Sequence, residues 1–122
     1  MPLPPLNVYR HDRTSHTLIT LAGEIDLATA PLVRATLATC VRDGIRAVDV
    51  DLTAVTRCDA DGLDAFLAAS RLAGEAGAAL RLHYPPPAMA RMTEVSGTGF
   101  LLHGPHAARS LPHRVAAAGG AS

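Results

Sequence analysis

Three aspartates, Asp59, Asp61 and Asp64, lie close together in the stretch RCDADGLDAF, directly ahead of an apolar run. Carboxylates at this spacing could ligate a metal ion, act as a general acid and base, or begin a helix. A calcium loop of the EF-hand type also needs an oxygen ligand at its fifth position and a glutamate at its twelfth. Counted from Asp59, those positions hold Leu63 and Ser70, so the metal-loop pattern fails.

Enzyme chemistry finds little further support in the sequence. An acid and base pair needs one carboxyl in an apolar pocket and the other in a polar one, within a cleft that positions a substrate. No glycine-rich phosphate loop, dinucleotide fingerprint or G-x-S-x-G elbow accompanies the aspartates. We therefore expect no enzyme, no cofactor and no metal. A small acid-dependent or metal-dependent hydrolase that uses Asp59, Asp61 and Asp64 remains an alternative.

The histidines and cysteines favour structural roles. His103 and His106 form a pair in a Gly-Pro turn with no acidic or cysteine neighbour in the sequence, which favours solvated side chains over a metal site. Cys40 falls on the apolar stripe of a predicted helix, as a small core residue does. Cys58 lies beside the aspartates at a strand end, where we expect burial, with redox control as the alternative.

A helix start explains the aspartate cluster more simply. We expect Asp61 at the N-cap, where its side chain accepts from the N–H groups of Leu63 or Asp64. Asp64 would reach back to the N–H of Asp61, as in a capping box. The positive end of the helix dipole would favour these charges by about 0.3–1 kcal/mol. Such a helix start also suits a phosphate.

Length and composition limit the class of protein. The 122 residues suffice for one domain with its own core. Eleven basic residues, all of them Arg, balance eleven Asp and Glu, so no overall field attracts nucleic acid or an anionic membrane. The sequence shows no signal-peptide pattern and no apolar stretch of about 18 residues. We expect a cytoplasmic protein with neither a nucleic-acid nor a membrane partner.

Hydrophobic periodicity predicts alternating strands and helices. Strands are expected at 7–10, 16–22, 47–52, 79–84 and 100–102, and helices at 30–43, from 61 to a stop near 74–77, at 85–97 and at 106–111. The first two strands form a hairpin, after which the segment GEIDLATAP leaves the strand. Thr29 is the expected N-cap of the first helix, with Pro31 in its first turn.

The order of these elements predicts an α/β fold. We expect one domain over 1–122, with its core at about 7–111, a frayed tail at 112–122, and a mixed β-sheet of four to five strands with helices packed on it. Asp49 and Asp51 share the polar face of one strand, where strand alternation accounts for them. We expect these two side chains to be solvated or to cap a loop.

Three segments of the chain resemble the STAS domains of bacterial anti-sigma factor antagonists. They are LAGEIDLATAP, VDVDLTAVTRCDADGLDAFLAASRLAGEAGAALRL and PPAMARMTEVSG, and the similarity spans about residues 7–111. The resemblance implies a mixed sheet with helices on one side and a D-S-S-G-type loop that opens the second main helix. In such proteins the second Ser of the loop is phosphorylated by a serine kinase that is itself the anti-sigma factor. The unphosphorylated antagonist binds this kinase and frees the sigma factor, whereas the phosphorylated form lets go.

The chain departs from this pattern at the phosphorylated position. Carried over by position, Asp59 matches the leading Asp, Ala60 the first Ser, Asp61 the phosphorylatable Ser and Gly62 the Gly. Asp61 has no hydroxyl, so it cannot be phosphorylated as the Ser is. It places one fixed negative charge where a phosphoserine has nearly two.

The resemblance implies a regulator of transcription that binds a kinase-type anti-sigma factor by partner switching, as a monomer or weak homodimer. We expect the partner to dock on the loop before the first helix and on the start of the second. The expected partner-binding residues are Asp26, Thr29, Asp59, Ala60, Asp61, Gly62, Leu63 and Asp64. The alternative is a STAS scaffold or sensor module in a larger regulatory assembly, in which Asp61 only caps a helix.

Overall fold

The computed structural model describes residues 5–103, which form a sheet of five strands with three α-helices. The elements in chain order are β1 (Leu6–Asp12), β2 (His16–Ile25), α1 (Ala30–Arg42), β3 (Ala47–Cys58), α2 (Ala60–Glu75), β4 (Ala79–His83), α3 (Pro87–Ser96), the 3₁₀ turn η1 (Gly99–Leu101) and β5 (Leu102–His103). The predicted hairpin and the alternation of strands and helices are confirmed. The expected helix at 106–111 and the tail at 112–122 lie outside the described residues.

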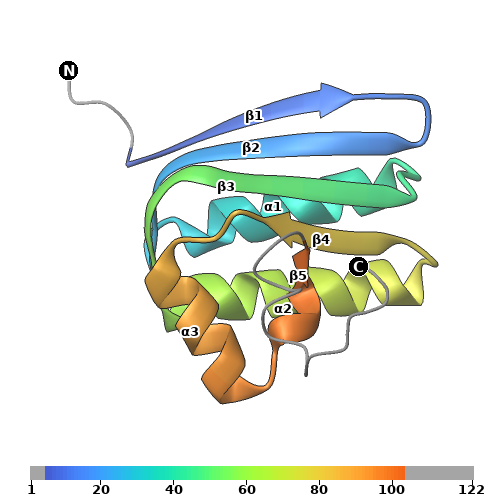
Figure 1. Cartoon of the computed structure of the whole chain (residues 1–122). Coiled ribbons are helices and arrows are strands. Elements are labelled where there is room, and N and C mark those ends of the chain that lie inside the picture. Colours follow the sequence, from blue (N-terminus) through green and yellow to red (C-terminus); the bar gives the residue numbers. More distant parts are fainter. Residues whose placement is uncertain (1–4, 104–122) are drawn as a thin grey trace.

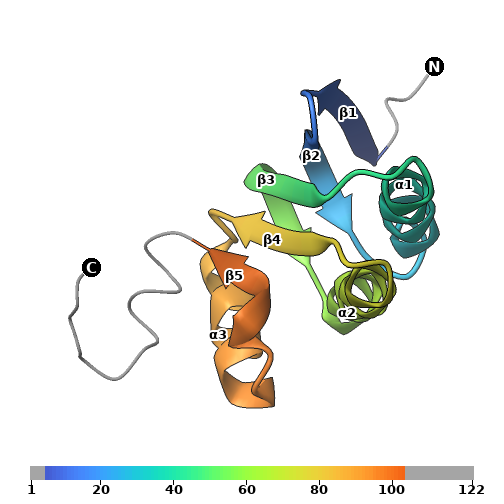
Figure 2. The same ribbon diagram turned by 90° about the vertical axis from the view of Figure 1, so that its right-hand side faces the viewer.

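The sheet is mixed, with strand order β1-β2-β3-β4-β5. β1 pairs antiparallel with β2, and the remaining neighbours are parallel. α1 and α2 cover one face of the sheet, and α3 lies beside β5 (Figures 1 and 2). Because β2, β3 and β4 are parallel, the loops that lead into the three helices all leave the sheet at its carboxyl edge, on the left in Figure 1.

The core lies between the sheet and α1 with α2. Strand alternation turns Val48, Val50 and Leu52 of β3 toward the helices, where at most 1% of each residue is exposed. Phe66 of α2 is fully buried against this layer. Burial of one such side chain stabilises the fold by about 1.5–3 kcal/mol.

No helix within residues 5–103 is long and apolar enough to cross a membrane.

β2 and β3 extend beyond their predicted ends, to Ile25 and Cys58. The polar and apolar alternation breaks there because the register of the two strands shifts twice between Thr20 and Glu24. Gly23 lies at this irregularity with φ of 127°, and an added Cβ would stand 2.1 Å from a backbone oxygen of the chain entering β1. The segment GEIDLATAP therefore begins inside the strand and not after it.

The last part of the described chain also differs from the prediction. The expected strand at 100–102 is the turn η1 followed by a strand of two residues. Only Leu82 and His83 of β4 pair with β5, because β5 has only two residues. α3, in contrast, ends as predicted at Gly97, which adopts the left-handed conformation with φ of 74°.

Candidate functional site

Reciprocal hydrogen bonds between Asp26 and Thr29 close the loop between β2 and α1. Asp26 Oδ1 accepts from the N–H groups of Ala28 and Thr29 at 3.0 and 3.2 Å, and Thr29 Oγ1 accepts from the N–H of Asp26 at 2.9 Å. The Thr29 hydroxyl donates to the carbonyl of Glu24 at 2.9 Å. Thr29 occupies the N-cap position of α1 as predicted, but its side chain makes no capping hydrogen bond to the helix. The tight turn leaves Leu27 72% exposed.

Asp59, and not Asp61, caps α2. The helix begins at the next residue, and Asp59 Oδ1 accepts from the N–H groups of Asp61 and Gly62 at 3.1 and 3.2 Å. The predictions of Asp61 as the N-cap and of Asp64 reaching back to it are wrong. β3 pairs with β2 as far as Cys58, so Asp59 is the first residue beyond the sheet and has the extended backbone of an N-cap.

The loop into α1 and the start of α2 lie side by side. The N–H of Asp59 donates to the carbonyl of Ile25 at 3.1 Å, which ties the two chain segments together where they leave the sheet. Arg57 adds ion pairs to Asp26 at 3.2 Å and to Glu24 at 3.7 Å. These contacts make one surface, which we call the α1/α2 surface and which comprises the loop 26–29 and residues 59–64. Local sequence patterns do not indicate the role of Arg57, because its partners are about thirty positions away.

Gly62 allows α2 to approach the sheet closely. An added Cβ would stand 2.6 Å from Cγ2 of Ile25, 2.7 Å from Sγ of Cys58 and 3.2 Å from the carbonyl oxygen of Ile25. Non-bonded carbon atoms prefer separations of about 3.5–4.0 Å, so no side chain fits at this position without displacing its neighbours. The glycine of the loop is therefore required by packing.

Both cysteines are buried, as predicted. Cys40 of α1 is fully buried, and burial raises the pKa of its thiol. Cys58 is 7% exposed, and burial together with the neighbouring Asp59 carboxylate raises the pKa of its thiol to about 12. Because the thiolate is the reactive form, neither side chain is activated for redox chemistry.

The expected partner-binding residues differ in exposure. Those that are buried, and so shape the surface without presenting a side chain, are Thr29, Gly62 and Leu63. Asp26 and Asp59 are half-buried through their capping bonds. Ala60, Asp61 and Asp64 are exposed. Asp61 is the second residue of α2, where the helix dipole favours its negative charge.

The α1/α2 surface carries a negative charge. Burial acts to raise the pKa of Asp26, but the hydrogen bonds from Thr29 and Ala28 lower it overall, so the carboxylate is ionised at neutral pH. The carboxylate of Asp61 makes no hydrogen bond or ion pair with residues 5–103. Its charge is therefore presented to whatever approaches α2.

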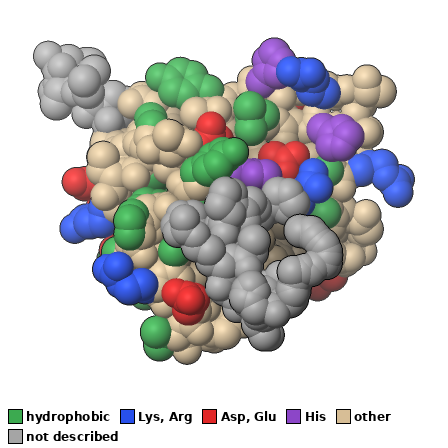
Figure 3. Space-filling model, viewed as in Figure 1, with side chains coloured by type: hydrophobic (Ala, Val, Ile, Leu, Met, Phe, Trp, Pro, Cys, Tyr) green, Lys and Arg blue, Asp and Glu red, His purple; other side chains and the backbone are tan. Residues whose placement is uncertain are grey.

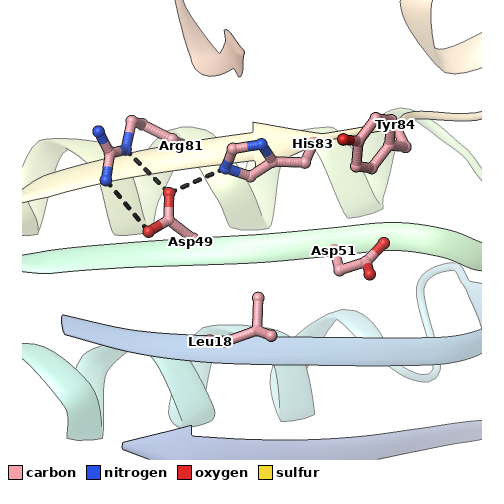
Figure 4. Close-up of a pocket in the computed structure, with 6 residues that line it drawn as sticks. All are labelled: Leu18, Asp49, Asp51, Arg81, His83 and Tyr84. Atoms are coloured by element: carbon pink, nitrogen blue, oxygen red, sulfur yellow. Dashed lines mark hydrogen bonds and ion pairs between the residues drawn. The ribbon is translucent and has the colours of Figure 1, made fainter. Parts of the chain in front are cut away.

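A second polar cluster lies on the sheet face opposite α1 and α2. Asp49 accepts from Arg81 Nε at 2.9 Å and Arg81 Nη2 at 3.1 Å, and it lies 2.8 Å from His83 Nε2 (Figure 4). Burial acts to raise the pKa of Asp49, whereas the hydrogen bonds with His83 and Arg81 lower it overall. The prediction of a solvated or loop-capping Asp49 is wrong, because its partner stands directly opposite on β4.

The neighbouring Asp51 is half-buried and lies inside β3, so it does not cap a loop. Its Oδ1 accepts from the N–H and the hydroxyl of Thr53, two residues further along the strand, at 2.9 and 2.6 Å. No group of three or more His, Cys, Asp or Glu side chains within residues 5–103 is placed to hold a metal ion.

The matched family model is described as "Mlab, STAS domain" and covers residues 10–103. The chain belongs to the STAS family. Its fold is similar to that of the anti-sigma factor antagonist SpoIIAA in its unphosphorylated form, with a TM-score of 0.70 and 19% identity over 80% of this chain and 86% of that one. No curated protein matches this STAS domain.

Two further solved structures share the fold. The Bacillus cell fate determinant SpoIIAA in the phosphorylated form aligns with a TM-score of 0.66 and 20% identity, over 80% of this chain and 89% of that one. An anti-sigma factor antagonist from Mycobacterium paratuberculosis aligns with a TM-score of 0.72 and 24% identity, over 84% and 90%. The α/β fold expected from the sequence is thus that of anti-sigma factor antagonists.

Proposed function

We propose that this STAS domain is an anti-sigma factor antagonist-like regulator of transcription, which binds a serine-kinase anti-sigma factor through the α1/α2 surface. The family match and the shared fold support the class of protein. The observation that carries the proposal is the exposed position of Asp61 at the start of α2, directly beside the loop 26–29. In the resemblance described above, this position carries the phosphorylatable Ser.

Asp61 acts in this proposal as a fixed partial substitute for phosphoserine. It supplies one charge and two acceptor oxygens, where phosphoserine supplies nearly two charges and three such oxygens. The carboxylate has no competing partner within the described part of the chain, so the full charge meets the kinase. The domain would then remain in a weakly binding state that resembles the phosphorylated one.

The partner that fits this surface presents basic groups around an apolar pocket. Asp26, Asp59 and Asp64 supply the negative charge that these basic groups meet, and the exposed Leu27 supplies an apolar contact. The partner places no basic group opposite Asp61, because such a group would make the Asp61 charge strengthen and not weaken binding. Complementary charge increases the association rate of two proteins. Salt screens this attraction beyond about 10 Å at an ionic strength of about 0.1 M. We therefore expect the association rate to fall as the salt concentration rises.

A calorimetric titration against the kinase-type anti-sigma factors of the same organism tests the proposal. We expect Leu27→Ala to weaken binding by about fivefold or more, as truncation of a contact side chain does. Val95→Ala is the matched control, because it truncates an exposed apolar side chain on α3, outside the α1/α2 surface. The proposal fails if neither the natural domain nor Asp61→Ser binds any of these kinases. Stable self-association without kinase binding would instead favour a scaffold.

The weak-binding role of Asp61 has its own test. Without ATP, Asp61→Ser should bind the kinase more tightly than the natural domain, because the change removes a negative charge that no basic group of the partner faces. Asp61→Asn, which keeps the shape and removes the charge, should bind similarly to Asp61→Ser. Equal or weaker binding of both variants would show that the charge does not lock the domain. With ATP, mass spectrometry should find a phosphate on Asp61→Ser and none on the natural domain.

A further inference from the structure

An open cavity lies on the sheet face that α1 and α2 leave uncovered. It has a volume of about 360 Å³ and is lined by Leu18, Asp49, Asp51, Arg81, His83 and Tyr84. These side chains come from three adjacent strands and the residue after β4 (Figure 4). Figure 3 views the molecule from this side and shows acidic, basic and histidine side chains grouped together. The cavity is separate from the α1/α2 surface and does not depend on the proposed function.

The charges in this cavity do not balance among the lining residues. Asp49 is neutralised by the two hydrogen bonds from Arg81, which form a bidentate pair. Asp51 receives hydrogen bonds only on Oδ1, and both come from the neutral groups of Thr53. Its Oδ2 has no partner within residues 5–103. Within residues 5–103, Asp51 is therefore the carboxylate of the cavity that no cationic side chain pairs with.

Tyr84 gives the cavity an aromatic rim held in a strained backbone. Its φ is 56°, which is uncommon for a residue with a side chain, and the next residue is a proline. Tyr84 is 54% exposed, and the centroid of its ring lies 6.1 Å from the centroid of the His83 ring. Strain of this kind clusters at binding sites, where the surrounding structure holds one side chain in place. An exposed ring close to a free carboxylate suits an organic cation.

We propose that this cavity binds the guanidinium group of an arginine side chain. Asp51 Oδ2 accepts its hydrogen bonds, the ring of Tyr84 packs against its plane, and the exposed Leu18 contacts its aliphatic stem. The same face already holds one guanidinium in this way, in the Arg81 and Asp49 pair. A protein partner is one source of such an arginine. This chain is the other, because residues 104–122 follow directly on β5, which pairs with His83 of the cavity, and they contain two arginines and no acidic residue.

NMR titration of the full chain with agmatine, which carries a guanidinium group on an aliphatic stem, tests the site. We expect amide shifts centred on Leu18, Asp51 and Tyr84. Asp51→Asn should weaken agmatine binding about tenfold, because a charged acceptor becomes a neutral one. The Asn oxygen can still accept from Thr53, and urea unfolding checks that the fold is kept. Glu75→Gln, an exposed charge on α2, should leave the affinity unchanged.

The double variant Arg109→Gln with Arg114→Gln identifies the source of the arginine. If these arginines fill the cavity, the amide signals of the cavity residues in the variant differ from those of the natural chain before any ligand is added. The variant then also binds agmatine more tightly than the natural chain. If a partner supplies the arginine, the variant and the natural chain bind agmatine alike. The proposal is overturned if agmatine moves no cavity amide in either protein, or if Asp51→Asn binds it as well as the natural chain.

Discussion

Substitution of Gly62 by Ala should destabilise the domain and displace the start of α2. The added Cβ meets Cγ2 of Ile25 at 2.6 Å and Sγ of Cys58 at 2.7 Å, and both side chains are buried. The carbonyl of Ile25 also lies 3.2 Å from the new atom and already accepts from the N–H of Asp59. Two buried side chains and one hydrogen-bonded carbonyl group therefore crowd the added Cβ. Overpacking of this kind costs about 1–3 kcal/mol.

Gly74→Ala in the same helix is the matched control. Apart from the adjacent residues and the backbone of its own helix, no atom lies within 4 Å of a Cβ added at Gly74. Replacement of a helical glycine by alanine stabilises a protein by up to about 1 kcal/mol. The same chemical change should thus have opposite signs at the two positions, and urea unfolding followed by circular dichroism measures both free energies. If Gly62→Ala proves as stable as the natural protein, the close approach of α2 to the sheet is refuted.

Three further changes test individual contacts. Asp59→Ala should lower the free energy of unfolding by about 1 kcal/mol, because α2 loses its N-cap. Asp59→Asn should lower it much less, because Asn also caps a helix, and equal losses in the two variants would exclude capping. Because the folded pKa of Asp49 lies below its unfolded value of about 3.9, its contribution to stability is present above that value and is lost as the pH falls through the folded pKa. Asp49→Asn should therefore be less stable than the natural protein at pH 7, with a difference in unfolding free energy that narrows below about pH 4; a difference that stays constant would contradict this. Cys40 and Cys58 should react with a thiol reagent at pH 8 only in denaturant, and rapid labelling of the native protein would contradict their burial.

Local patterns predicted much of the fold. Alternation placed Val48, Val50 and Leu52 on the buried face of β3, and the structure confirms it. Thr29 at the N-cap and Gly97 at a helix end were also readable, because caps depend on residues adjacent in sequence. These features need no knowledge of distant parts of the chain.

Other features depend on contacts between distant residues. Either Asp59 or Asp61 could cap α2 by sequence, and the choice depends on how far β3 pairs with β2. The pairing of Asp49 with Arg81 joins residues 32 positions apart, and only the register of β3 and β4 places them opposite each other. Sequence periodicity gives neither the register of parallel strands nor the ion pairs that follow from it.

NMR mapping of the surface bound by the kinase-type anti-sigma factor tests the central claim most directly, because it detects weak as well as tight binding. The kinase is added to the labelled natural domain and to Asp61→Ser. We predict amide shifts at Leu27, Ala28, Ala60 and Asp61 in the natural domain, and at the same positions with tighter binding in the variant. Shifts confined to the open sheet face around Leu18, or no shifts with either protein, would contradict the α1/α2 surface as the partner site.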